Sequence, residues 1–438
     1  MGAKIIAFSG PLAKHVEFMK VQEIDLAGSG SRSPLKRLFP QLSLSACQLR
    51  RPWQLVVLGA CFATLTPVCA TTTVSASTAQ PQTDPQSENR STAGGRPPIV
   101  LGYYPSWPCG LEPAQIRYEN FTHLCHAFVT ATPDGKLKTD GNLPSRELTS
   151  RAHAAGVKVL LSVGGADSGK YMGPIATSET LRTQFARALV GMVREYGYDG
   201  IDLDWEFPTN PTEKEAFTQL ARELRELLGP SSQGTNLLTS AQVGVPDVVQ
   251  NVDMQALRGV MDWVAIMTYD MHGPWSNHAG YNAAFRTPKG DREGCTSRSL
   301  VAQMATWRDA GGWPPERLLV GIPCYGRSFP VRRWHDPMPP NTKPARPYLA
   351  YKDILPLLEQ GWVRHFDNYA MVPWLEKPGG GELLSYDDVE SVQHKTRWAR
   401  QNGFGGVFFW EISQDRMGGR NVLIEAARKA WESNSREP

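Results

Sequence analysis

The sequence predicts an α/β protein built on one (β/α)8 barrel, the TIM-barrel architecture, over residues 97–434. From residue 99 onward, eight short apolar runs recur, mostly unbroken by polar residues, as is typical of strands buried on both faces. Stretches of helical periodicity separate several of these runs, and strand–helix units repeated this often favour a closed barrel. Periodicity alone leaves a doubly wound open sheet as the alternative.

The apolar runs predict eight strands in chain order: Ile99–Tyr104, His123–Val129, Val157–Val163, Gly200–Trp205, Leu237–Val243, Val260–Thr268, Leu318–Cys324 and Gly405–Trp410. The helical patterns predict Glu147–Ala155, Glu179–Tyr196, Pro211–Leu228, Ser299–Ala310, Val389–Gln401 and Val422–Ser433. Between the last two strands, residues 330–386 are rich in Pro, Trp and Gly and too long for one helix. We therefore expect a small α+β insertion subdomain there.

The region 1–70 is typical of a secretory signal, although it lies unusually far along the chain. Arg50-Arg51 precedes an apolar run over residues 55–70, which ends in the small-residue pattern Val68-Cys69-Ala70. The run is too short and too interrupted for a membrane span, so we expect none in the mature protein. Either translation starts downstream of the first residue or the charged region is unusually long.

Leu58–Cys61 is similar to a lipoprotein box, but the apolar stretch continues past Cys61, which argues against a lipid anchor. Residues 71–96 are rich in Thr, Ser, Gln and Pro and predict a disordered linker. We therefore expect a secreted protein, either extracellular or periplasmic.

The composition gives no sign of a charged partner or a cofactor. A net charge of +3 is small for 438 residues, so nothing indicates nucleic acid or an acidic surface as a partner. No close Cys-x-x-Cys pair exists, and we expect no metal, no organic cofactor and a monomer. Cys109, Cys125, Cys295 and Cys324 allow three pairings, and free buried thiols account for them equally well.

The fourth predicted strand carries a row of acids. Because a strand alternates its faces, Asp202, Asp204 and Glu206 point to one side, toward the barrel interior. Glu206 then lies at the carboxyl-terminal mouth, where barrel enzymes form their active sites. Like charges this close cannot all ionise, so protons are shared and proton affinity rises, as a general acid requires.

All three acids come from one strand and therefore from one side of a bound substrate. Most glycosidases instead place two carboxylates on opposite sides of the bond that they cleave. A 2-acetamido group on the sugar supplies the missing nucleophile in the substrate-assisted exception. The row thus points toward N-acetylated sugars.

The run from Asp199 to Glu206 resembles the DxxDxDxE signature of family-18 glycoside hydrolases, the chitinases and their relatives. Other segments resemble the family in order and spacing, and together they cover about residues 98–434. They are Leu161–Gly165 (SxGG), Met267–Asp270 (MxYD), Tyr325–Phe329 (YGR), Ser385–Asp388 before the last crossover helix, and Trp410 at the end of the eighth strand.

The resemblance implies hydrolysis of β-1,4-linked N-acetylglucosamine chains with retention of configuration. Glu206 would protonate the glycosidic oxygen, and Asp204 would orient the acetamido group and stabilise its developing charge. Asp202 would share a proton with Asp204, and Tyr269 would hydrogen-bond the acetamido group. The implied sugar-binding residues are Tyr103, Trp107, Phe128, Gly165, Met267, Asp270, Trp275, Arg327 and Trp410.

Some residues in these segments have other interpretations. Packing inside the barrel explains Met267 as well as a sugar contact does. His272 is expected to make a loop contact. Ala166 and Asp167 follow the SxGG segment where many groove-forming chitinases have a Trp, so one stacking platform is absent. In the insertion, Asp367, Tyr369 and Trp374 are candidate wall residues.

Two alternative functions remain. One is an endo-β-N-acetylglucosaminidase acting on glycoprotein or cell-wall glycans. The other is a non-catalytic chitin-binding lectin, against which the intact Glu206, Asp204 and Tyr269 argue.

Overall fold

The computed structural model describes residues 97–232, 234–291 and 297–433. The predicted signal over residues 1–70 and the predicted linker over 71–96 lie outside the described residues. Cys295 lies outside them as well, whereas Cys109, Cys125 and Cys324 are free thiols.

Eight parallel strands form a closed barrel, which confirms the predicted fold class and excludes the open sheet. Strand β1 pairs in parallel with both β2 and β14, and this double pairing closes the sheet. The barrel strands are β1 (Ile99–Pro105), β2 (His123–Ala131), β4 (Lys158–Gly165), β5 (Gly200–Trp205), β6 (Leu237–Gln242), β7 (Trp263–Ile266), β8 (Leu318–Pro323) and β14 (Gly406–Trp410). A short strand β3 (Leu137–Lys138) adds an antiparallel pair to β2.

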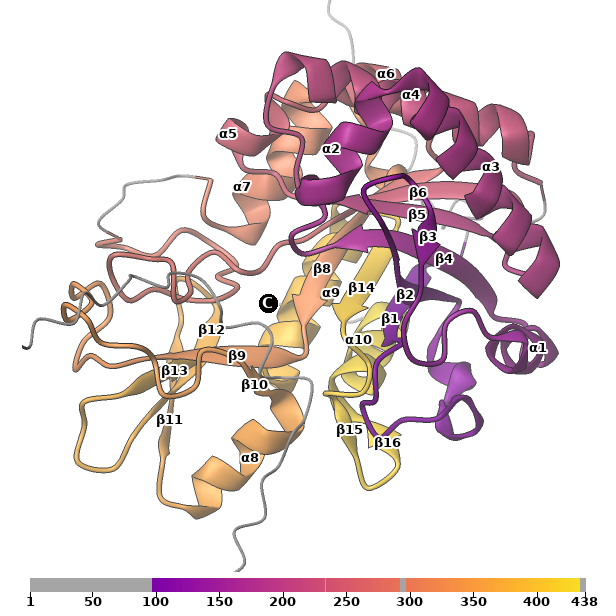
Figure 1. Ribbon diagram of the computed structural model, residues 1–438. Helices are drawn as coiled ribbons and strands as arrows, with labels where there is room; N and C mark the ends of the chain where they lie inside the picture. Colours follow the sequence, from indigo (N-terminus) through magenta and orange to yellow (C-terminus); the bar gives the residue numbers. More distant parts are fainter. Residues whose placement is uncertain (1–96, 233, 292–296, 434–438) are drawn as a thin grey trace, which may run out of the picture. The chain divides into compact units, whose positions relative to one another are not determined.

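Helices cover the outside of the barrel (Figure 1). They are α1 (Arg146–Ala154), α2 (Gly169–Thr177), α3 (Glu179–Tyr196), α4 (Pro211–Leu228), α5 (Pro246–Val249), α6 (Met254–Arg258), α7 (Leu300–Ala305), α9 (Val389–Gln401) and α10 (Val422–Glu432). Short 3-10 turns lie at Pro113–Gln115, Tyr118–Asn120 and Pro315–Arg317. Local sequence sets several boundaries: Asn210 caps α4 before Pro211, and Gly197 ends α3 in the left-handed conformation.

Two helical segments differ from prediction. The helix expected over 299–310 divides into α7 and a π-helical turn, η4 (Thr306–Ala310). Helix α2 was not predicted, because it starts at Gly169 and contains Pro174, two residue types that disfavour a helix.

A five-stranded sheet lies between β8 and β14 in the chain, with the order β10-β9-β13-β12-β11 (Figure 1). It comprises β9 (Tyr325–Phe329), β10 (Leu349–Ala350), β11 (Val363–Asp367), β12 (Val372–Glu376) and β13 (Leu383–Ser385), together with helix α8 (Tyr351–Glu359). Its first strand starts directly after β8, ahead of the expected start at residue 330. A two-stranded hairpin, β15 (Arg416–Met417) and β16 (Arg420–Asn421), precedes α10.

Strand β5 alternates between two environments. Ile201, Leu203 and Trp205 are fully buried in the core between barrel and helices, where Trp205 packs edge-on against Phe217 of α4. Asp202 and Asp204 take the intervening positions and are also buried. The alternation therefore directs the two acids into the barrel interior.

A buried ion pair lies at the start of α9, and its lysine also reaches the loop after β7. The Lys395 ammonium donates hydrogen bonds to both Asp387 oxygens, at 2.6 and 2.8 Å, and to the Ala283 carbonyl at 2.7 Å. The Ser391 hydroxyl donates to the same carboxylate. Both charged side chains are fully buried, so each depends on the other for solvation.

We predict that Lys395→Met destabilises the protein by about 3–5 kcal/mol, because it leaves the Asp387 carboxylate buried without its counter-charge. Urea unfolding measures this loss. Arg308→Ala is the matched control, since it removes an exposed pair with Asp309 and should cost less than about 1 kcal/mol. Equal losses in the two variants would contradict the prediction.

Candidate active site

Asp202 accepts three hydroxyl hydrogen bonds inside the barrel. Tyr103 and Ser162 donate to its Oδ2 at 2.9 and 2.8 Å, and Thr239 donates to its Oδ1 at 2.7 Å. Ser162 on β4 and Thr239 on β6 are the register partners of Asp202, so the parallel pairing itself places these donors on either side. Burial raises the pKa of Asp202, and the hydroxyl donors counteract part of that rise.

Asp204 lies further along β5, and Glu206 follows the last residue of that strand. Burial raises the pKa of Asp204 well above its ordinary value, and the charges of Glu206 and Asp202 add to the effect. The Asp204 Oδ1 atom is buried and has no hydrogen-bond partner among the described residues. Burial, followed by the nearby carboxylates of Asp270 and Asp167, raises the pKa of Glu206 from 4.5 to about 7.

The loop after β4 supports the end of β5. The Ser168 hydroxyl accepts a hydrogen bond from the Glu206 N–H at 2.8 Å and donates to the Asp204 carbonyl at 3.2 Å. A Cβ at Gly164 would lie 1.9 Å from that carbonyl oxygen, and one at Gly165 would lie 2.5 Å from the Phe128 ring. Both glycines also have positive φ, so this segment requires glycine twice.

Aromatic rings surround the acids. Trp410 stacks on Phe128 with centroids 5.5 Å apart, and it lies 5.4 Å from Tyr103 and 6.2 Å from Trp107. Trp107 is 38% exposed, so the ring group extends from the buried Tyr103 to solvent. This increase in exposure along the ring group suits a sugar ring, which packs an apolar face on an aromatic side chain and keeps its hydroxyl groups in contact with water.

A second group of contacts joins the loop after β7 to the inserted sheet. The Asp270 Oδ1 atom accepts hydrogen bonds from Tyr325 at 2.6 Å and from two Arg327 nitrogens at 2.8 and 2.6 Å. The Arg327 guanidinium also lies 4.8 Å from the centre of the Trp275 ring, which is 60% exposed. Asp270 has a φ of 57°, a left-handed conformation in which Asp is among the better-tolerated residues.

Tyr269 connects the two groups. Its ring packs edge-on against Tyr325 and Phe408, at 6.1 and 6.0 Å, and it lies in the interior cluster with Tyr103. Met267 belongs to the same cluster and is buried, which accords with barrel packing. Tyr269 therefore links the contacts around Asp270 to the interior cluster that contains Tyr103 and Met267.

The three insertion residues are engaged elsewhere. Asp367 accepts hydrogen bonds from the Tyr281 hydroxyl and from the N–H groups of Tyr369 and Ala370. Trp374 stacks on His365 with centroids 4.0 Å apart. Asp367 and Trp374 thus have partners within and beside the insertion, whereas the Tyr369 ring is exposed and has the Lys289 ammonium 4.6 Å from its centre.

Sequence reasoning missed Tyr348 and Ser168. Tyr348 stacks on Tyr325 at 4.2 Å and is 39% exposed, so it extends the aromatic surface beside Arg327. No pattern in the sequence distinguishes it from the other aromatic residues of the insertion. Ser168 was within reach of prediction, because it follows the SxGG segment closely.

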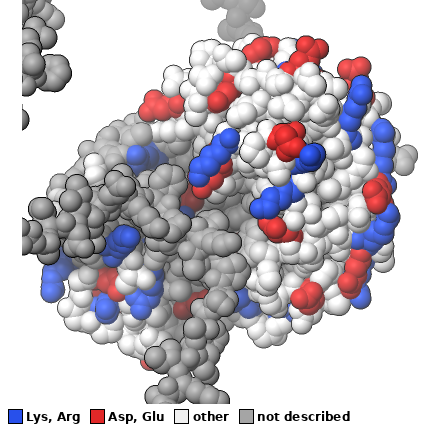
Figure 2. Space-filling model, viewed as in Figure 1, with Lys and Arg blue, Asp and Glu red and all other residues white. Residues whose placement is uncertain are grey.

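Charge on the viewed face is mixed. Figure 2 shows Lys and Arg interspersed with Asp and Glu on that face, with no large area of a single sign. With a net charge of +3, this distribution accords with an uncharged substrate. In the described part of the chain, no helix is both long and apolar enough to cross a bilayer.

A model of the glycosyl hydrolases family 18 matches residues 99–415. The chain belongs to this family. The match spans all eight barrel strands and the inserted sheet, and it confirms the resemblance drawn from the sequence motifs.

Relatives cover most of the same region. A chitinase-like effector of Moniliophthora roreri is 27% identical, over 75% of this chain and 92% of its own. Mouse chitotriosidase-1 is 32% identical, over 67% of each chain. The crystal structure of Ostrinia furnacalis Group IV chitinase in complex with allosamidin superposes with a TM-score of 0.69 at 28% identity, over 76% of this chain and 98% of that one.

We predict that Glu206→Gln stabilises the protein at pH 8 but not at pH 4. The pKa of Glu206 is raised from 4.5 to about 7, so folding disfavours its ionised form. That penalty is absent below about pH 4.5, where both folded and unfolded states are protonated, and is complete above about pH 7. The gain should reach no more than about 3 kcal/mol, measured by urea unfolding at both pH values. An equal difference at the two pH values would contradict the raised pKa.

Proposed function

We propose that the protein hydrolyses β-1,4 bonds in chitin or chito-oligosaccharides by the retaining, substrate-assisted route. The observation that carries this proposal is the row of acids along and just beyond β5. Asp202 and Asp204 are buried on the strand, and Glu206 follows its last residue, close enough for its charge to raise the pKa of Asp204. The neighbouring carboxylate of Asp270 is engaged by Tyr325 and Arg327, so it is poorly placed to act as a nucleophile. The acetamido oxygen of an N-acetylated sugar then takes that role.

Glu206 acts as the general acid in this mechanism. With a pKa of about 7, it keeps its proton in a large fraction of molecules near neutral pH. It gives that proton to the glycosidic oxygen while the acetamido carbonyl oxygen attacks the anomeric carbon. The bond to the leaving sugar breaks and an oxazolinium ion forms. Glu206, now ionised, takes a proton from the water that opens this ion, so configuration is retained.

Asp204 orients the acetamido group. Its buried Oδ1 has no hydrogen-bond partner in the described part of the chain and is suited to accept the acetamido N–H, which becomes more acidic as positive charge develops. Asp202, held by three hydroxyl donors, remains fixed beside Asp204 and shares a proton with it. Tyr269 donates its hydroxyl to the acetamido oxygen.

The rings define how the sugar chain lies. Trp410 forms the floor under the reacting sugar, supported by Phe128 and Tyr103. The exposed faces of Trp107 and Trp275 stack more distant sugars. Ala166 offers no ring at the position after the glycine pair, so we expect weaker retention of a long chain than in enzymes with a Trp there.

The relatives' names include a chitinase-like effector as well as chitinases, so hydrolysis by this chain is argued from Glu206 and Asp204. We further propose that the protein is secreted. This rests on the basic pair, apolar run and small-residue end over residues 50–70.

The deciding experiment incubates the full chain with the N-acetylglucosamine hexamer and identifies products by mass spectrometry. We expect dimer and trimer from the wild type. Glu206→Gln should reduce turnover on the order of 10²–10⁴-fold while binding of the hexamer survives, because the proton donor is lost and the aromatic surface is intact.

Glu215→Gln is the matched control, since Glu215 is exposed on α4 and contacts Gln219. Turnover by Glu206→Gln comparable to this control would refute the acid assignment. Hexamer binding without cleavage by the wild type would favour a lectin. Cleavage of a high-mannose glycoprotein in place of the hexamer would favour an endo-β-N-acetylglucosaminidase.

We predict that Asp167→Asn moves the alkaline limb of the pH–rate profile to lower pH. The Asp167 carboxylate helps to raise the pKa of Glu206, so neutralising it makes the acid lose its proton at lower pH. Asp167 is largely exposed, so a shift of about half a pH unit or less is expected. Asn suits its φ of 67°, and Asp134→Asn in the β2–β3 hairpin is the control. Profiles of kcat/KM from pH 4 to 9 measure the effect, and coincident profiles would contradict it.

A further inference from the structure

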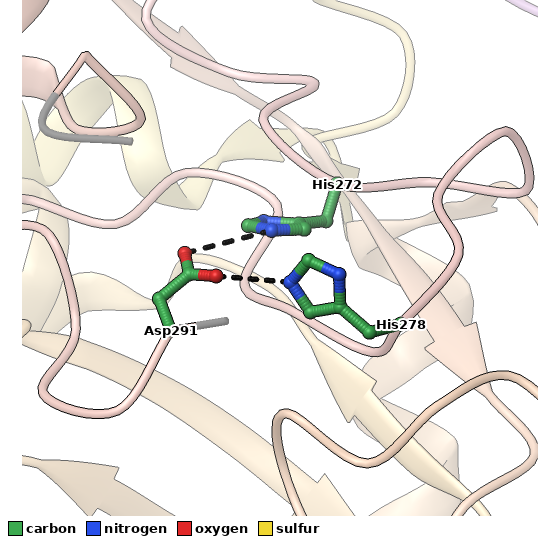
Figure 3. A group of neighbouring side chains, drawn as sticks. All are labelled: His272, His278 and Asp291. Atoms are coloured by element: carbon green, nitrogen blue, oxygen red, sulfur yellow. Dashed lines mark hydrogen bonds and ion pairs between the residues drawn. The ribbon is translucent and has the colours of Figure 1, made fainter. Parts of the chain in front are cut away.

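Two histidines and an aspartate converge in the loop between β7 and α7, outside the proposed catalytic row. The Nε2 atom of His278 lies 2.9 Å from Asp291 Oδ1, and that of His272 lies 3.6 Å from Asp291 Oδ2 (Figure 3). All three side chains are at most 2% exposed. The two rings meet edge to face at 4.9 Å, so each turns its Nε2 toward a different oxygen of the same carboxylate (Figure 3).

The hydrogen bonds of the other ring nitrogens fix the histidine tautomers. His272 Nδ1 lies 3.2 Å from the Tyr281 carbonyl oxygen, and His278 Nδ1 lies 2.7 Å from the Asn277 side-chain oxygen. Both partners are acceptors, so each neutral ring carries its hydrogen on Nδ1. A neutral His272 therefore turns the lone pair of Nε2 toward Asp291, and this nitrogen has no hydrogen-bond partner among the described residues. His278 Nε2 lies at hydrogen-bond distance from Asp291 Oδ1. A lone pair that faces a carboxylate repels it unless a cation lies between them.

This arrangement is that of metal ligands. A histidine that binds a metal through one nitrogen usually donates the other N–H to a carbonyl or carboxylate, as both rings do here. One ligand atom from each residue lies within 4.8 Å of the other two. Bonds of about 2.0–2.1 Å in tetrahedral geometry place ligand atoms about 3.4 Å apart, and the observed 2.9 and 3.6 Å bracket that separation.

The surrounding backbone supports the cluster. A Cβ at Gly280 would lie 2.3 Å from the His272 ring, so glycine is needed there for the ring to reach its place. His278 forms an isolated β-bridge with Pro337, and the Ala279 N–H donates to the Asp336 carbonyl at 3.0 Å. The loop is thus tied on one side to the segment after β9, and the site does not depend on side chains alone.

We infer that His272, His278 and Asp291 bind a divalent transition-metal ion, with Zn²⁺ the best match to two imidazoles and one carboxylate. This inference departs from the sequence-based expectation of no metal, which considered only cysteine pairs. Water or a further ligand completes the coordination. The Arg298 guanidinium donates a hydrogen bond to the carbonyl of Met271, the residue before His272, and so places a positive charge near the site. The negative charge of Asp291 is therefore essential to hold a cation there.

The position of the site gives the ion a structural task. Trp275 lies between the two histidines in the chain, and Asp270 lies two residues before the first of them. The ion therefore fixes both ends of the turn that presents Trp275 to Arg327. Its role is to hold this part of the proposed sugar-binding surface, and it takes no part in the chemistry at Glu206.

The test uses the full chain, purified through a tag without histidines, dialysed against excess Zn²⁺ and then against metal-free buffer. Elemental analysis should find about one Zn²⁺ per chain in the wild type and less than about a tenth in Asp291→Asn and His272→Gln. His365→Gln is the matched control, because it removes an exposed His–Glu376 pair at 3.2 Å and should leave the stoichiometry unchanged.

A second measurement does not depend on whether the variants fold. Chelation of the wild type should lower its Tm by roughly 5 °C, and Zn²⁺ but not Mg²⁺ should restore it. Replacement by Co²⁺ should give the visible absorption of a four-coordinate site. A wild type that retains no metal, with a Tm indifferent to chelator and Zn²⁺, would overturn the inference. Equal zinc in Asp291→Asn and the wild type would overturn it as well.

Discussion

Burial of a row of carboxyl groups inside the barrel is the constraint on which the rest of the site depends. An acid with no water around it needs donors from the protein, and Asp202 obtains three hydroxyls from three different strands. Two of those donors, Ser162 and Thr239, stand in register with it on β4 and β6. A register slip of one residue in either pairing would turn a donor away from the carboxylate. The register of the barrel strands therefore determines which hydrogen-bond donors reach the buried acid.

The loop after β7 is likewise held by hydrogen bonds from several elements. Asp270 is bonded to Tyr325 and Arg327 of β9, the Asn282 N–H donates to Ser385 of β13, and Lys395 of α9 reaches the Ala283 carbonyl. The inserted sheet and the last crossover helix therefore both anchor this loop. That explains why the resemblance in sequence includes segments such as Ser385–Asp388, which lie far from the acids in the chain.

The sequence was sufficient for the barrel and for most of the site's members. Short apolar runs identified all eight strands, because a strand buried on both faces has little freedom in composition. Helix α2 was not predicted because Gly169 and Pro174 disfavour a helix locally. Packing of α2 against α4 overrides that local preference. The hydroxyl donors to Asp202 were not predicted for a different reason. A Ser or Thr in an apolar strand can hydrogen-bond many partners, and only the strand register shows which acid it contacts.

The way the sheet closes bears on how the chain folds as it is made. Residues 99–102 of β1 pair with residues 406–409 of β14, so the seam of the barrel joins its first and last strands. When seven of the eight barrel strands have been synthesised, the nascent sheet still has two unpaired edges, on β1 and on β8. Strand–helix units along the chain can form earlier, but the acids in the interior are sealed from water only when the final barrel strand is in place. Loss of the chain beyond β8 would therefore leave an open sheet whose carboxylates are hydrated, and such a fragment would differ from the enzyme in its protonation as much as in its shape.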